Sequence, residues 1–98
     1  MLSIAQRLEQ YTLKRPHEVL LVSAEVDGEF DQIAIFKGFS SSLVRSTAFD
    51  PDVPVLSEAA KILTIDRLEA PFNPGAPRYI QQAIDWDTMQ TLLAEVGV

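Results

Sequence analysis

The N-terminal segment has the residue pattern of an amphipathic helix. Apolar side chains recur every three or four positions, at Ile4, Leu8 and Tyr11. Polar side chains lie between them, which is typical of a helix that packs one face against a core. Ser3 and Gln6 match a capping box, in which each side chain accepts a hydrogen bond from the other residue's backbone N–H. We therefore predict a helix from Ser3 to Leu13, which ends before Pro16 because proline disfavours helical geometry in the preceding residue.

Two β-rich segments follow and are joined by a strong turn signal. Residues 18–26 (EVLLVSAEV) are aliphatic and β-branched, and residues 30–39 (FDQIAIFKGF) alternate apolar and polar side chains. The dipeptide Asp27-Gly28 between them is typical of a two-residue type I′ turn. Such a turn sets the hairpin register. The predicted cross-strand pairs are Val26 with Glu29, Ala24 with Asp31, Val22 with Ile33, and Leu20 with Ile35.

The opposite face of this hairpin is apolar at one end only. Near the turn its side chains are polar, at Ser23, Glu25 and Gln32. Near the hairpin base they are apolar, at Val19, Leu21, Ala34 and Phe36. An antiparallel sheet covered by helices on one side normally keeps its other face polar. The apolar base therefore predicts either an exposed patch for a partner or a patch that a curled sheet covers with its own loops, and both alternatives stay open.

The middle of the chain predicts two more strands around a proline-containing loop. The glycine and three serines of residues 38–42 mark a connection, after which residues 43–49 (LVRSTAF) form the third predicted strand. Residues 50–55 (DPDVPV) hold two prolines, which remove hydrogen-bond donors and predict a loop or an edge segment. Residues 61–68 are rich in Ile and Leu and predict the fourth strand, with a helical turn over residues 57–60 as an alternative.

The C-terminal part of the chain predicts two helices after a rigid loop. Residues 71–77 contain three prolines and one glycine, and Pro77 is suited to be the first residue of a helix that extends to about Ala83. Asp85 is a favourable cap for a second helix, and Gly97 is typical of its end. The apolar stripe of that helix is formed by Trp86, Met89, Leu92, Leu93 and Val96. The predicted order is thus a helix, four strands and two helices, in one α+β domain over residues 1–98.

Composition excludes several classes of protein. The chain has 98 residues, 47% of them hydrophobic, which is enough for one core without a covalent or metal staple. It has no cysteine, which excludes disulfides, thiolate metal sites and a cysteine nucleophile, and fits the cytoplasm. The apolar runs are short and the N-terminus lacks signal-peptide features, so we expect neither membrane insertion nor secretion. A net charge of −6 opposes nucleic-acid binding.

The residues that carry chemistry do not form a recognisable catalytic or metal motif. His17 is the only histidine, and its place before a predicted strand favours a structural role over that of a catalytic base. Asp50 and Asp52 flank a proline but lack the further oxygen ligands of a calcium loop. The acidic residues at the hairpin turn are expected to be solvated and to protect the sheet edge. Phosphate-binding glycine motifs are absent. We therefore expect no enzyme activity, no metal and no cofactor.

Three arginines have aromatic neighbours in the sequence. Arg45, Arg67 and Arg78 lie near Phe49, Phe72 and Tyr79. Arginine and aromatic residues are enriched where proteins bind each other, but scattered arginines more often form solvated or structural ion pairs.

Two stretches of the chain carry a family resemblance. GFSSSLVRSTAFDPDVPVL and IDRLEAPFNPGAPRYIQQ resemble a small, mostly uncharacterised protein family of cyanobacteria with relatives in plastids. The positions that carry the resemblance are Gly38, Arg45, Asp50-Pro51-Asp52, Asn73-Pro74 and Arg78-Tyr79. The resemblance implies a roll-like α+β fold in which a four-stranded antiparallel sheet packs the N-terminal and C-terminal helices on one face. It also implies a role in the regulation of biofilm formation, and it supplies no active-site residues.

These observations predict a non-enzymatic regulatory or adaptor protein of the cytoplasm that binds an unidentified protein or a second copy of itself. The predicted partner-binding residues are the apolar base of the hairpin and two residues of the next predicted strand: Val19, Leu21, Ala34, Phe36, Arg45 and Phe49. The alternative function is binding of a small molecule in a hydrophobic pocket lined by aromatic residues and an arginine.

Overall fold

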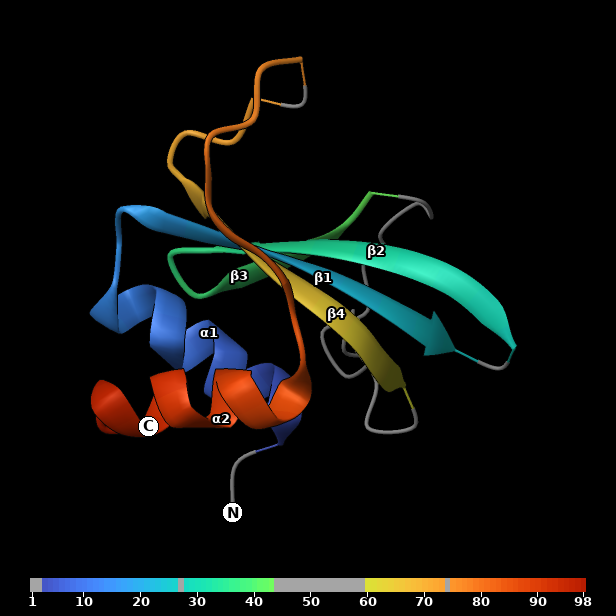
Figure 1. Cartoon of the computed structure of the whole chain (residues 1–98), viewed down its shortest axis with the longest axis horizontal. Helices are drawn as coiled ribbons and strands as arrows, with labels where there is room; N and C mark the ends of the chain where they lie inside the picture. Colours follow the sequence, from blue (N-terminus) through green and yellow to red (C-terminus); the bar gives the residue numbers. More distant parts are fainter. Residues whose placement is uncertain (1–2, 27, 44–59, 74) are drawn as a thin grey trace.

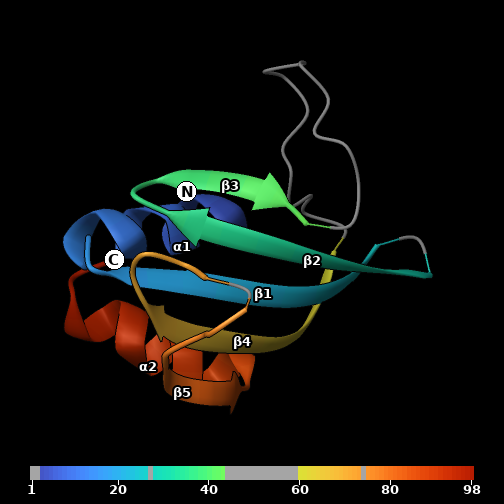
Figure 2. The same cartoon turned by 90° about the horizontal axis from the view of Figure 1, so that it is seen from above.

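The computed structural model describes residues 3–26, 28–43, 60–73 and 75–98 (Figure 1). The elements in chain order are α1 (Ile4–Lys14), β1 (Glu18–Val26), β2 (Glu29–Phe36), β3 (Phe39–Ser42), β4 (Lys61–Glu69), β5 (Tyr79–Ile84) and α2 (Trp86–Glu95). The strands form one antiparallel sheet in the order β3-β2-β1-β4-β5. Both helices lie on the same side of this sheet (Figures 1 and 2), so the predicted α+β class is confirmed, but the sheet has five strands and not the predicted four.

The N-terminal helix has the predicted cap. The Ser3 hydroxyl accepts a hydrogen bond from the Gln6 backbone N–H at 3.1 Å, and the Gln6 side chain accepts one from the Ser3 N–H at 2.9 Å. The helix ends at Lys14, before Pro16. Its buried residues are Leu8, Tyr11 and Thr12, which face the sheet.

The β1–β2 hairpin has the predicted register. Val26 lies opposite Glu29, and the pairing continues in step to Leu20 opposite Ile35. Asp27 lies outside the described residues. The faces also alternate as predicted, because Leu20, Val22 and Ala24 are buried in the core beneath the helices.

The third strand differs from the prediction. Phe39–Ser42 is β3, paired with β2, where the sequence indicated a connection. Serine disfavours strands when its hydroxyl competes for backbone groups. Here two hydroxyls have other partners: Ser40 donates to Glu9 Oε2 at 2.8 Å, and Ser42 donates to Asp31 Oδ1 at 2.9 Å. Of the predicted strand 43–49, Leu43 lies beyond β3 and the remainder lies outside the described residues, as do residues 50–55 and 57–59 of the predicted loop and helical turn.

The fourth strand is confirmed as β4, but the segment after the proline-rich loop is a strand rather than the predicted helix. β5 is the fifth strand and lies at the edge of the sheet, where its backbone pairs with the backbone N–H and C=O groups of β4. Its pairing with β4 is irregular. Ala83 adopts a positive φ of 54°, and its N–H donates to Asp66 Oδ1 at 2.7 Å instead of continuing the ladder. The non-local partner strand thus outweighs the local helix signal of Pro77.

The C-terminal helix α2 confirms the second helix predicted there. Asp85 caps it by accepting a hydrogen bond from the Thr88 N–H at 2.8 Å. Met89 and Leu93 are buried between helix and sheet, and the rest of the predicted stripe packs around them: Trp86, Leu92 and Val96. No helix in the described ranges is long and apolar enough to cross a membrane.

Candidate functional site

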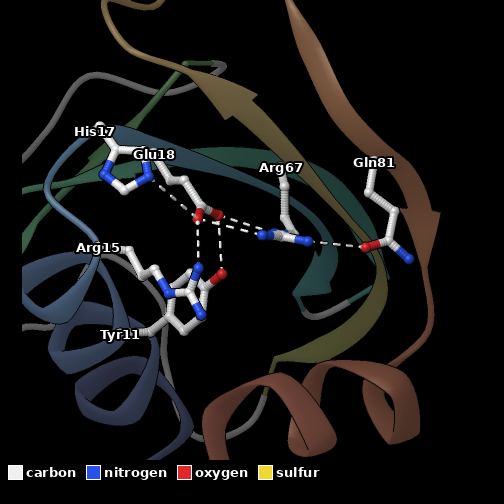
Figure 3. Close-up of polar contacts among 6 residues, drawn as sticks. All are labelled: Tyr11, Arg15, His17, Glu18, Arg67 and Gln81. Atoms are coloured by element: carbon white, nitrogen blue, oxygen red, sulfur yellow. Dashed lines mark hydrogen bonds and ion pairs between the residues drawn. The ribbon is translucent and has the colours of Figure 1, made fainter. Parts of the chain in front are cut away.

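Among the described residues, the most extensive polar cluster centres on Glu18, which is 1% exposed at the start of β1 beside α1 (Figure 3). The Tyr11 hydroxyl donates a hydrogen bond to Glu18 Oε1 at 2.8 Å. Arg67 from β4 donates two bonds to the carboxylate, from Nε at 2.8 Å and from Nη2 at 3.2 Å. Arg67 also donates to Gln81 of β5 at 3.1 Å. The cluster therefore connects α1 and three strands.

The buried negative charge of Glu18 is compensated by the positive charges and hydrogen-bond donors around it. Burial is the largest influence on the Glu18 carboxyl and would raise its pKa, but hydrogen bonds from Arg67 and Tyr11 and the charges of Arg67 and Arg15 together lower it. Burial, reinforced by the bond to Glu18, raises the pKa of Tyr11 to about 12. The bond to Glu18 raises the pKa of Arg67. At neutral pH the cluster thus holds one carboxylate, one guanidinium and a neutral phenol.

This arrangement is structural in character. Both carboxylate oxygens already accept hydrogen bonds, so Glu18 is poorly placed to act as a base. Arg15 Nη1 approaches Glu18 Oε2 at 3.7 Å, and the largely exposed His17 Nε2 lies 3.9 Å from the same oxygen. The described residues contain no group of three or more side chains suited to hold a metal ion. What the cluster does is position the C-terminal end of α1 on the sheet.

The residues predicted to bind a partner differ in how far they are buried. Val19 is 1% and Leu21 is 6% exposed, and they form a small core with Leu68 on the helix-free face. Ala34 and Phe36 pack against this core and are partly buried. Ala70 and Phe72, which follow β4, cover it further. The alternative in which the chain's own segments cover the apolar base therefore holds for Val19 and Leu21.

The three arginines that have aromatic neighbours in the sequence do not form one group. Arg67 is in the Glu18 cluster, and Arg78 approaches Glu69 at 3.9 Å as an exposed pair. Arg45 and Phe49 lie outside the described residues. Among the described residues of the predicted surface, the four hairpin residues lie together.

A second surface lies where α1 ends beside the β2–β3 turn. The Gly38 N–H donates to Thr12 Oγ1 at 2.9 Å. The Leu13 side chain lies against Gly38, so closely that a Cβ atom at residue 38 would be 3.2 Å from it. Both segments meet at the left of Figure 1. We call this edge of the molecule the basic corner and define it by four exposed residues: Leu13, Lys14, Lys37 and Phe39. Leu13 and Lys14 lie on the helix side of the sheet, and Phe39, which lies opposite Phe36, points to the helix-free side.

The basic corner combines exposed apolar area with positive charge. Phe39 is 77% exposed and Leu13 is 54% exposed. Lys37 Nζ lies 5.3 Å from the centroid of the Phe36 ring, a cation–π contact that continues the surface toward the helix-free face. Among the described residues nearby, Glu18 is paired with Arg67, and Glu9 keeps its charge while it accepts a hydrogen bond from Ser40, so one unpaired carboxylate faces the two lysines. The corner is thus locally basic in a chain of net charge −6.

Sequence reasoning missed this corner because its residues come from separate elements. Lys14 belongs to the last turn of α1, and Phe39 begins β3, which was predicted as a connection. The sequence did offer one signal, the glycine of Lys37-Gly38 directly after an alternating strand, which is typical of a tight turn. In the structure these two residues have positive φ values of 50° and 83° and form that turn.

Comparison with protein families identifies the family of this chain. A family model described as Domain of unknown function (DUF7734) matches residues 5–93. The chain belongs to this family. No curated protein matches the chain, and no solved structure matches it either. The family match covers all five strands and nearly all of both helices.

Proposed function

We propose that this DUF7734 domain is a non-enzymatic protein-binding domain that docks its partner at the basic corner. The observation that carries the proposal is the 77% exposure of Phe39, which follows the Lys37-Gly38 turn on which the Leu13 side chain packs. Single exposed apolar residues are ordinary on protein surfaces, but apolar area together with a charged rim marks binding sites. Aromatic side chains supply much of the binding energy at such sites.

The partner is a protein segment that combines acidic and apolar side chains. The two lysines attract carboxylates, and Phe39 gives apolar side chains a surface on which to lose water, with Leu13 on the helix side of the same edge. A nucleic acid fits less well, because its long array of phosphates would also meet the acidic remainder of a chain with net charge −6.

The Glu18 cluster supports this function because it fixes the position of the α1 end that forms part of the basic corner. Tyr11 and Arg15 belong to the end of α1, and both interact with Glu18 at the start of β1. Thr12 joins the same end of the helix to Gly38. A surface held in its binding geometry loses less conformational entropy on association, which favours affinity.

The wider role follows the family resemblance of the sequence. We propose a regulatory or adaptor protein of the cyanobacterial cytoplasm that acts in the control of biofilm formation. The support is the resemblance of residues 38–56 and 65–82 together with the absence of a catalytic arrangement in the described residues. A binding domain fits such a role because regulation needs recognition and not chemistry.

Selection from a displayed library of random peptides tests the docking surface. We expect enriched peptides to combine Asp or Glu with Phe, Leu or Trp, and to lose at least tenfold in affinity for Phe39→Ser and for Lys37→Glu. The matched control is Ile80→Ser on β5, where Ile80 is also an exposed apolar residue. Its affinity should be unchanged.

Two results would overturn the proposal. One is a set of enriched peptides that bind Phe39→Ser as tightly as the wild type. The other is a small molecule that co-purifies in stoichiometric amount and stays bound to Phe39→Ser, which would favour the small-molecule function instead.

A further inference from the structure

The tip of the β1–β2 hairpin has the chemistry complementary to the basic corner. Glu25 and Glu29 are exposed there, and Phe30, which follows Glu29, is 56% exposed. Glu25 lies opposite Phe30 in the hairpin register. We call these three residues the acidic tip. Lys61 lies opposite Glu25 in the β1–β4 register and offsets part of its charge, so Glu29 carries most of the net charge of these three residues.

The two surfaces lie at opposite ends of the molecule. Figure 1 shows the hairpin tip at the right end of the long axis and the basic corner at the left end. The nine residues of β1 separate them by roughly 25–30 Å. The acidic tip therefore has no access to the basic corner of its own chain.

The exposed aromatic rings also share one side of the sheet. Phe30 and Phe36 are six positions apart in β2, and Phe39 lies opposite Phe36 in β3. Side chains two, four or six positions apart in a strand point to the same face. A second molecule shifted along the direction of the hairpin thus brings its Phe30 to Phe39 on the helix-free side.

We propose that the acidic tip of one copy docks on the basic corner of a second copy, in a head-to-tail contact. Glu29 pairs with Lys14 or Lys37, and Phe30 packs on Phe39 on the helix-free side. This inference rests on the proposed function, because the second copy is a partner with acidic and apolar side chains. The surfaces are different, so the contact leaves a free tip and a free corner, and further copies add to them.

The small number of contact residues makes this self-association weak. Few charges and a modest apolar area give an interface below the size of stable permanent complexes. We expect monomers at micromolar concentration and larger species as the concentration approaches the millimolar range.

Two variants with one blocked surface each test the contact. The corner variant carries Lys37→Ser and Phe39→Ser, and the tip variant carries Glu29→Ser and Phe30→Ser. Sedimentation velocity of the wild type should show growth with concentration, while each variant alone stays monomeric. An equimolar mixture should form one-to-one dimers and nothing larger, because only one intact tip and one intact corner meet. Ile80→Ser is the control and should associate like the wild type.

The outcomes separate this inference from the proposed function. A wild type that stays monomeric near millimolar concentration, or a mixture of variants that stays monomeric, overturns the head-to-tail contact. Circular dichroism of each variant establishes that it is folded. If the selected peptides still bind the tip variant and not the corner variant, the proposed function holds even where self-association fails. If they bind both variants equally, the proposed function fails as well.

Discussion

At the scale of single residues, Glu18 shows how a buried charge is accommodated. A carboxylate without partners would be costly in this position, but Arg67 binds it through two nitrogens and Tyr11 donates a third hydrogen bond. The cost of burying the charge is offset only while all three groups are present. The cluster is therefore sensitive to protonation.

Stability should depend on pH at both extremes through this cluster. The folded-state pKa of Glu18 is below its ordinary value of 4.5, so its contribution is present above that value and is lost as pH falls through the folded pKa. The pKa of Tyr11 is raised from 10.0 to about 12, so its contribution is present below pH 10.0 and is lost as pH rises toward 12.

Denaturant titrations over these two ranges measure the effect. We expect Glu18→Gln to lose less stability than the wild type between neutral pH and acid, and Tyr11→Phe to lose less between neutral and alkaline pH. Tyr79→Phe is the matched control for the loss of a tyrosine hydroxyl, because Tyr79 is exposed. Equal slopes for the wild type and both cluster variants would contradict the structural account.

At the scale of elements, the contact between α1 and the β2–β3 turn requires a glycine. Gly38 has a φ of +83°, which costs any other residue about 1–2 kcal/mol, and a Cβ there would press on Leu13 at 3.2 Å. The turn and the helix end can approach each other only because this side chain is missing. Gly28 has a similar φ of +79°, but a Cβ there would meet nothing within 4 Å.

The two glycines make a matched pair of substitutions. Gly38→Ala should lower the free energy of unfolding more than Gly28→Ala does, because both incur the backbone strain and only the first crowds Leu13. Urea denaturation measures both. In Gly38→Ala combined with Leu13→Ala, the two costs should be non-additive, since the crowding is already relieved. Equal costs for the two glycines would show that the contact at Gly38 has no energetic weight.

At the scale of the whole molecule, the acidic tip and the basic corner give an acidic protein two ends of opposite local charge. An association that depends on exposed lysines and glutamates is screened by salt, since the Debye length falls from about 10 Å at 0.1 M to about 3 Å at 1 M. The wild type should therefore associate more weakly at high salt. Sedimentation velocity at fixed protein concentration and two salt concentrations measures this, and association that strengthens with salt would indicate a purely apolar contact elsewhere.

Local patterns were sufficient for elements whose information lies in neighbouring residues. The Ser3 capping box, the Asp85 cap, the stripe of α2 and the hairpin register were all predicted, because caps, helical spacing and short turns act over a few residues. The same was true of β4, whose aliphatic run identified a strand. Local signals failed for β3 and β5, where serines and Pro77 indicated other structures.

What tertiary structure decided is the pairing of segments that are distant in the sequence. β5 is a strand because β4 presents an edge to it, and β3 is a strand because Glu9 and Asp31 accept hydrogen bonds from its serines. Residues 18–36 by themselves determined a hairpin with an apolar base and an acidic tip. Only the folded chain decided that Val19 and Leu21 are covered and that Leu13 meets Gly38 to form the basic corner, because burial and proximity depend on which surfaces the whole chain brings together.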